Sequence, residues 1–175
     1  MRNTFIVVPV FGGTDAGKPE SLKIEIREKN GFRGVFAKEE IAMNSVIKLE
    51  GVITSHPTRH SIQLGEDKHL SVPPDQEVTQ NQNFFWKYLN HSCQPNSEIN
   101  TASVTFRPLR KIGQGEECTF NYLTTEYEMA APFTCNCGAA NCFGLIRGYK
   151  YLSAEQREEL TAHARTVIVM PEPSS

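Results

Sequence analysis

The chain has 175 residues, of which 39% are apolar and 22% are charged. This length supports one domain with a hydrophobic core and is too short for two domains of ordinary size. The formal net charge of −2 leaves no basic surplus that would attract nucleic acid non-specifically, so we expect no direct nucleic-acid partner.

The first 20 residues combine a short apolar run, read as a possible strand, with a glycine-containing loop. The run from Phe5 to Phe11 ends at Gly12-Gly13. It lacks the small-residue cleavage site of a secretory signal and is too short to span a bilayer. We therefore expect an intracellular protein, cytoplasmic or nuclear, with no membrane partner. In a reducing compartment the five cysteines are expected to be thiols or thiolates.

Short strands are predicted along most of the first half of the chain. Alternating or compact apolar runs, bounded by glycine and proline, predict strands over residues 22–26, 35–37, 45–49, 62–64 and 69–72. The Pro73-Pro74 pair ends the last of them. Aromatic residues at near-helical spacing predict one or two helical turns within residues 79–89.

Further short strands, a loop and one helix are predicted in the second half of the chain. Strands are predicted over residues 103–106 and 118–122, and Phe120 and Tyr122 are expected to face the same side of the second strand. Residues 133–144 are expected to form a loop, and residues 171–175 a frayed tail. Ser153 and Gln156 match a capping box, which predicts a helix to about Arg165. Many short strands with few helices indicate a β-rich domain.

Three cysteines near the C-terminus are the strongest chemical signal. Cys135, Cys137 and Cys142 lie within eight residues of one another, among polar residues and glycine. Thiolates at such spacing can converge on one zinc ion if a fourth ligand comes from elsewhere. Cys93 is a candidate fourth ligand, although the spacing alone does not fix it. The alternative, small apolar residues in a core, suits Cys118 better.

The other notable segments are ordinary when each is taken alone. Residues 90–96 match a polar turn ended by proline, and a lone histidine such as His91 is more often a hydrogen-bonded loop residue than a catalyst. Residues 31–34 are a weak signal for close approach of a ligand to the backbone. Residues 115–122 match a hairpin turn that enters an aromatic strand.

In this order, however, the segments resemble the SET-domain protein-lysine methyltransferases that carry a post-SET zinc segment. The resemblance runs from about residue 22 to 148 and depends on four motifs: Gly31-Phe32-Arg33-Gly34-Val35-Phe36-Ala37, Tyr88-Leu89-Asn90-His91-Ser92-Cys93-Gln94-Pro95-Asn96, Gly115-Glu116-Glu117-Cys118-Thr119-Phe120-Asn121-Tyr122 and Cys135-x-Cys137-x4-Cys142-x-Gly144. The chain departs from the family pattern at Phe32, which stands where a glycine is usual.

The resemblance implies a mainly β fold with short helices. Small curved sheets would surround a knot-like crossing of the chain, followed by a zinc-bound post-SET segment and a C-terminal helix. It divides the chain into an N-terminal extension (1–20), a SET domain (21–125), a post-SET zinc segment (126–148) and a C-terminal helix with a tail (149–175).

The resemblance also implies a site. S-adenosylmethionine would bind on one face, and a substrate lysine would enter a narrow channel from the other. Tyr122 matches the catalytic tyrosine, while Phe120 and Leu145 would line the substrate channel. The residues matching the zinc ligands are Cys93, Cys135, Cys137 and Cys142. The residues matching the cofactor site are Phe32, Arg33, Gly34, Asn90, His91 and Phe143.

The expected activity is transfer of methyl groups to a lysine of a histone or non-histone protein. In the family, phenylalanine two positions before the catalytic tyrosine leaves room for further methyl groups, so Phe120 predicts a di- or trimethylating enzyme. Two alternatives remain: a methyltransferase that acts on a small molecule, and a non-catalytic binding module that retains the fold and its zinc.

Overall fold

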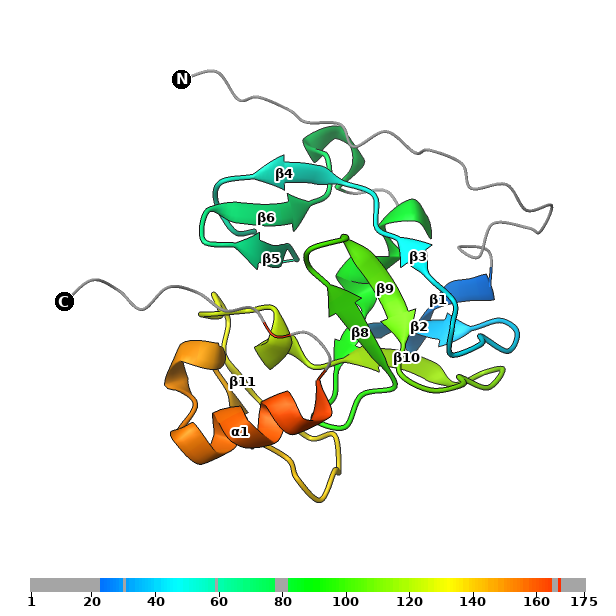
Figure 1. The fold of residues 1–175 in the computed structure, drawn as a ribbon. Coiled ribbons are helices and arrows are strands. Elements are labelled where there is room, and N and C mark those ends of the chain that lie inside the picture. The colour runs from blue at the N-terminus through cyan, green and yellow to red at the C-terminus, as the bar shows by residue number, and fades with distance from the viewer. Residues whose placement is uncertain (1–22, 30, 59, 78–81, 165–166, 168–175) are drawn as a thin grey trace.

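The computed structural model describes residues 23–29, 31–58, 60–77, 82–164 and 167. Four small sheets and several short helices make up this part of the chain (Figure 1). The strand and loop expected within residues 1–20 and the tail expected over 171–175 lie outside the described residues. The expectation of a mainly β fold with short helices is confirmed.

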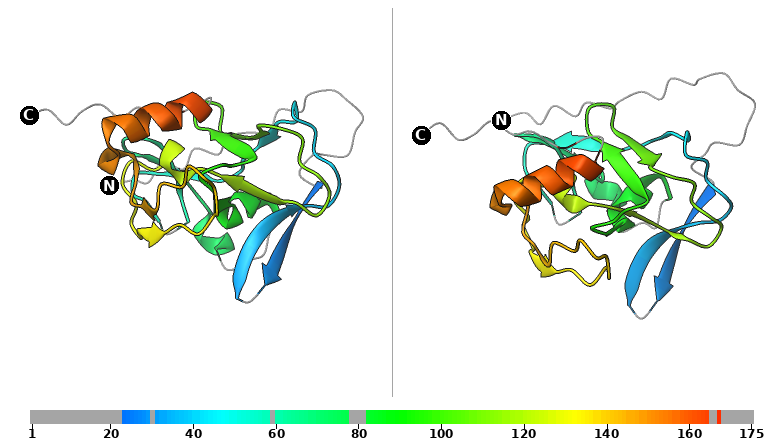
Figure 2. Two further views of the ribbon diagram at one scale, coloured as in Figure 1. Left: turned by 90° about the horizontal axis from the view of Figure 1, so that it is seen from below. Right: turned by 60° about the horizontal axis from the view of Figure 1, so that its bottom comes forward.

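The largest sheet has four strands in the order β1-β2-β10-β7. Its strands are β1 (Ile24–Lys29), β2 (Phe32–Ala37), β10 (Glu117–Phe120) and β7 (Asn90–His91). The antiparallel hairpin of β1 and β2 projects on the side away from the C-terminal helix (Figure 2). Strand β10 pairs antiparallel with β2 but parallel with β7. The sheet therefore joins three widely separated parts of the sequence.

Three smaller sheets complete the fold, with orders β3-β9-β8, β4-β6-β5 and β11-β12. Their bounds are β3 (Ile47–Lys48), β9 (Thr105–Pro108), β8 (Ser97–Asn100), β4 (Val52–Thr54), β6 (Lys68–Ser71), β5 (Ile62–Gly65), β11 (Phe133–Thr134) and β12 (Leu145–Ile146). The helices are the 3-10 turns η2 (Pro74–Gln76), η3 (Gln82–Tyr88), η4 (Tyr122–Thr124) and η5 (Tyr149–Tyr151) and the α-helix α1 (Ala154–His163).

Two hydrophobic clusters lie between these elements. The larger one packs the sheets around η3, where the rings of Phe85 and Phe106 meet edge to face at 5.8 Å. The smaller one joins the cysteine segment to α1 through Leu160. Tyr122 packs against both clusters. This residue therefore lies where the sheets meet the C-terminal segment.

Most of the predicted elements occur, with shifted ends. The helix of α1 begins with the predicted capping box, in which Ser153 accepts from Gln156 N–H, and it ends at His163. The strand predicted over residues 118–122 is wrong at its end, because β10 stops at Phe120. The Asn121 side chain accepts a hydrogen bond from Leu123 N–H, which caps η4 and turns Tyr122 out of the strand.

Asn96 and Glu116 fix the approach to β10. The Asn96 side chain accepts from Thr119 N–H at 3.0 Å and donates to Glu117 O at 2.7 Å and to Glu116 Oε1 at 3.1 Å. The Glu116 carboxylate also accepts from the Arg110 guanidinium and from Gly113 N–H. Together these bonds hold the segment that leads to Tyr122.

This carboxylate makes an acid-sensitive contribution to stability. Its hydrogen bonds from Arg110 lower the pKa of Glu116 to about 2. Because this folded-state pKa is depressed, the contribution is present above the ordinary carboxyl pKa and is lost as the pH falls towards about 2. Since the side chain is 34% exposed, we expect about 1 kcal/mol at neutral pH. Urea unfolding of wild type and Glu116→Gln, at about pH 7 and at about pH 3, gives the free energy of unfolding of each protein. The difference between the two proteins should be smaller at the lower pH. An equal difference at both pH values would contradict it.

Candidate active site and metal centre

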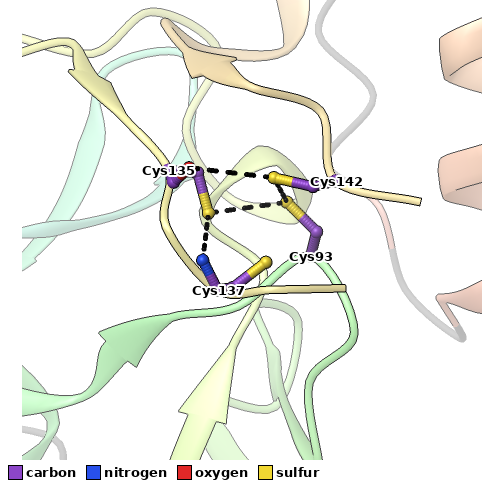
Figure 3. A group of neighbouring side chains, drawn as sticks. All are labelled: Cys93, Cys135, Cys137 and Cys142. Carbon is purple, nitrogen blue, oxygen red and sulfur yellow. Dashed lines mark hydrogen bonds between the residues drawn. The ribbon is translucent and has the colours of Figure 1, made fainter. Parts of the chain in front are cut away.

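Four cysteines form a cluster beside η4. Cys93 follows β7, Cys135 follows β11, and Cys137 and Cys142 lie in the loop before β12 (Figure 3). Their four Sγ atoms all lie within 4.8 Å of one another, and Cys93 Sγ is 3.8 Å from Cys135 Sγ. Four sulfurs about 2.3 Å from a tetrahedral zinc ion would be about 3.8 Å apart. The cluster therefore fits a closed zinc site and could hold the ion.

The surroundings of these sulfurs suit bound thiolates. The N–H groups of Cys137, Phe143 and Gly144 each lie 3.4 Å from a cysteine Sγ and donate to it, and such bonds favour the charged sulfur. Burial acts in the opposite direction and raises the pKa of the Cys93 thiol. A metal cation would supply the charge that removes this proton. The structure therefore brings together the four predicted ligands, and it leaves Cys118 buried in the larger cluster.

His91 joins this cluster to Tyr122. Its Nδ1 accepts a hydrogen bond from Tyr122 N–H at 3.1 Å, and its Nε2 lies 3.2 Å from Cys93 Sγ. Burial lowers the pKa of His91 to about 4, so the ring is neutral and carries its proton on Nε2. The sequence predicted only a backbone role for His91 at the adenine. The cross-linking role of the ring was missed, because its partners lie in other segments.

Asn90 and Gly34 meet across the large sheet. Asn90 Nδ2 donates to Arg33 O at 2.9 Å and to Glu117 Oε1 at 2.7 Å. A Cβ on Gly34 would lie 2.5 Å from Glu117 Oε1 and 3.1 Å from Asn90 Nδ2, so a side chain there would displace this contact. The structure therefore brings together Arg33, Gly34 and Asn90. Phe32, at the end of the hairpin, is 79% exposed.

A pocket lies beside this group. It has a volume of about 330 Å³, and its lining includes Arg33, Tyr88, Thr54 and Ser71. The Arg33 guanidinium lies over the Tyr88 ring, 5.6 Å from its centroid. The same guanidinium pairs with Glu28 at 2.9 Å. A pocket of this size could hold part of a small cofactor.

Tyr122 lies in an aromatic enclosure. Its hydroxyl donates to Leu89 O at 2.7 Å, and ring centroids lie 4.8 Å away for Phe120, 5.2 Å for His91 and 6.0 Å for Phe133. Burial raises the pKa of the Tyr122 phenol, so the hydroxyl keeps its proton at neutral pH. Sequence reasoning missed Phe133. Its only signal is an aromatic residue just before the cysteine loop.

The two remaining predicted site residues lie on the C-terminal segment. Phe143 packs against the smaller cluster and donates its N–H to Cys93 Sγ. Leu145 pairs with Thr134 in the β11-β12 hairpin, and its side chain is 54% exposed. The structure therefore places Phe143 at the cysteine cluster. The role of Leu145 in a substrate channel stays a prediction.

Comparison with known proteins agrees with this geometry. A sequence profile described as the SET domain matches residues 32–123, more than half of the chain. The chain belongs to the SET-domain family. The expected family is thus confirmed, and so is the expected SET-like fold.

Two curated relatives and one solved structure illustrate the similarity. Methyltransferase flvH of Aspergillus flavus is 38% identical over 85 residues, which are 46% of this chain and 48% of the relative. The H3 lysine-36 specific histone-lysine N-methyltransferase of Gibberella zeae is 34% identical over 137 residues, which are 69% of this chain and 14% of the relative. KRYPTONITE, solved in complex with mCHG DNA and SAH, has a TM-score of 0.53 and 19% identity over 70% of this chain and 28% of that one. The chain spans about half or less of each, and the solved structure supports the fold alone.

Zinc removal should weaken this site as well as the fold. We expect one zinc per chain by metal analysis, and loss of it in Cys142→Ser. Chelation should lower both the melting temperature and the affinity for S-adenosylmethionine, because Phe143 and His91 contact Cys93 directly. Cys118→Ala is the matched control and should retain its zinc. Unchanged cofactor binding in metal-free protein would contradict this prediction.

Proposed function

We propose that this protein is an S-adenosylmethionine-dependent methyltransferase that modifies the side-chain amine of a protein lysine. The observation that carries the proposal is the parallel pairing of β7 with β10. It puts Asn90 beside Thr119 and His91 beside Phe120, two residues before Tyr122, whose hydroxyl donates to Leu89 O. Asn90, which is suited to hold a cofactor, and Tyr122, which is suited to orient an amine, thereby lie in the same region. We call this region, made of β7, β10 and Tyr122, the crossing.

The cofactor would be held by the β1-β2 hairpin, by the crossing and by the segment that carries Cys135, Cys137 and Cys142. Arg33 and Gly34 offer main-chain contacts, Asn90 its side chain, and His91 its backbone, while Phe143 would close over the adenine and Phe32 would lie at the outer edge. When bound, the sulfonium supplies an activated methyl group. SAH in the KRYPTONITE structure supports this choice of cofactor for the fold.

The enclosure around Tyr122 suits a lysine amine. A free lysine has a pKa near 10.4 and must lose a proton before it can attack a methyl group. Desolvation of the amine on entering a buried site disfavours the charged ammonium. The neutral Tyr122 hydroxyl, held by Leu89 O, can orient the amine or the methyl group. The zinc site, closed by four thiolates, would be structural.

A protein substrate is favoured by the relatives. The Gibberella zeae relative is named for histone H3 lysine-36, which supports a histone or another lysine-bearing protein as the acceptor. None of the helices in the described residues has the length and apolar character needed to cross a membrane. An intracellular location, cytoplasmic or nuclear, remains our prediction.

A small-molecule acceptor is the second candidate. The relative from Aspergillus flavus is named only as a methyltransferase, with no histone in its name. Transfer of labelled methyl groups to histone, to other peptide pools and to small amines would separate the two. Failure to bind S-adenosylmethionine would favour the non-catalytic module instead.

Tyr122→Phe should remove methyl transfer while leaving cofactor binding intact. The change deletes only the hydroxyl that donates to Leu89 O, so we expect kcat/KM to fall by about 10²-fold or more. The measurement is labelled methyl transfer to a panel of lysine peptides, with calorimetry for S-adenosylmethionine binding. Tyr151→Phe, in the exposed turn η5, is the matched control. Full activity of Tyr122→Phe would count against the proposed role.

Phe120→Tyr should change the number of methyl groups transferred. Phe120 is 4% exposed, and its ring lies 4.8 Å from that of Tyr122. A hydroxyl added here would hold a water or fill the space that a second methyl group needs. Mass spectrometry should therefore show di- or trimethylated product with the wild type and monomethylated product with the variant. Monomethylation by both proteins would refute the assignment.

A further inference from the structure

Glu126 lies just beyond the η4 turn that begins at Tyr122. Its N–H donates to Tyr122 O at 2.8 Å, and its side chain accepts from Gln63 N–H of β5. The segment that follows η4 passes beside β5 in Figure 1. The Glu126 side chain therefore lies between the turn of Tyr122 and the β4-β6-β5 sheet.

Hydrogen bonds fix the carboxylate in this place. Glu126 Oε1 accepts from Gln63 N–H of β5 at 3.1 Å and from the Thr125 hydroxyl at 3.0 Å. In return, Tyr127 N–H donates to Gln63 Oε1 at 2.9 Å. Both bonds to the carboxylate use Oε1. The residue is partly buried, and its second oxygen is not among the fully buried side-chain atoms that lack a hydrogen-bond partner.

Among the described residues, the charge of this carboxylate has no cationic partner. Within the part of the chain that the structure describes, no lysine or arginine forms an ion pair with it. The titratable groups of the neighbouring segments are Tyr122 before it, Tyr127 and Glu128 after it, Tyr149, Lys150 and Tyr151 of η5, and His69, which pairs with Gln63 across β5 and β6. Of the two that can be cationic, Lys150 pairs with Glu128, and burial lowers the pKa of His69.

Burial raises the pKa of Glu126 to about 7. Its charge is also one of the causes that raise the pKa of the Tyr122 phenol, so the two groups are within electrostatic reach. A carboxyl group that titrates near neutral pH is a stronger base than an ordinary one and is suited to accept a proton during catalysis. An arriving lysine ammonium would supply the missing positive charge.

We propose that Glu126 accepts the proton that the substrate lysine loses before methyl transfer, an inference that rests on the methyltransferase function proposed above. The proton passes from the lysine Nζ to the Glu126 carboxylate. The freed nitrogen lone pair then forms the bond to the methyl carbon as the carbon–sulfur bond breaks, and that electron pair remains on sulfur. The product is a methylated ammonium and S-adenosylhomocysteine. Glu126 afterwards releases its proton to water.

The test compares wild type with Glu126→Gln, which keeps an oxygen to accept from Gln63 and Thr125. The matched control is Glu128→Gln, an exposed carboxyl paired with Lys150. For wild type and control, kcat/KM for a lysine peptide should rise with pH through an inflection near the Glu126 pKa of about 7. In Glu126→Gln we expect the inflection to vanish and the rate at neutral pH to fall about 10²-fold or more. A thialysine peptide, whose amine is less basic, should restore part of the rate.

Two further measurements keep the inference open to refutation. Carbon-13 NMR of the carboxyl groups should show a titration near neutral pH that disappears in Glu126→Gln. Thr125→Val removes a hydrogen bond that lowers the Glu126 pKa, so it should move the kinetic inflection to higher pH, and this variant decides the matter if Glu126→Gln does not fold. An unchanged inflection in either variant overturns the inference and leaves the methyltransferase function standing. Wild type that binds cofactor and methylates nothing overturns both.

Discussion

The parallel pairing of β7 with β10 is the constraint on which the rest of the site depends. Each partner contributes only two residues, Asn90 beside Thr119 and His91 beside Phe120. So short a pairing has few ladder hydrogen bonds of its own and needs support from side chains. Asn96 bonds both Thr119 and Glu117, and the His91 ring accepts from Tyr122 N–H. Polar side chains thus fix a crossing that the strands alone would hold weakly.

The cysteine cluster secures this crossing from the outside. Cys93 lies two residues after β7, and its three partners come from the segment that carries β11 and β12. The hydrophobic cluster here is small, with Leu123, Ile146 and Leu160 as its main aliphatic members. A core of this size gives little stability by itself, and such segments are commonly stabilised by a bound metal ion. The same ligands would then hold Phe143 and Phe133 near the crossing.

The sequence predicted the chemistry of the site better than its local structure. The spacing of Cys135, Cys137 and Cys142 predicted a shared cluster, because thiolate ligands leave a local pattern. The strands β4, β7, β8, β11 and β12 were not predicted, and β11 lies at the start of the loop expected over residues 133–144. Three of them, β7, β11 and β12, have only two residues, which carry no periodic signal. The turn at Tyr122 was wrongly predicted as strand, because aromatic alternation outweighed the capping role of Asn121.

Residues whose roles depend on distant partners were the hardest to find. Glu126 and Gln63 are 63 residues apart in the chain and meet through a hydrogen bond. In isolation, each is an ordinary polar residue. Glu117 likewise acquires its role only when folding brings it within 2.7 Å of Asn90 Nδ2. No motif marks such pairs, so only the fold reveals the electrostatics around Tyr122.

The central claim is that two ligands approach one crossing from opposite sides and meet at Tyr122. Amide NMR titrations with S-adenosylhomocysteine and with a lysine peptide test it most directly. The nucleoside should shift the signals of Gly34 and His91, the peptide those of Tyr127 and Phe133, and both should shift Tyr122. The account would be contradicted if both ligands shifted the same set of amide signals and displaced each other. It would also be contradicted if the Tyr122 signal shifted with neither ligand.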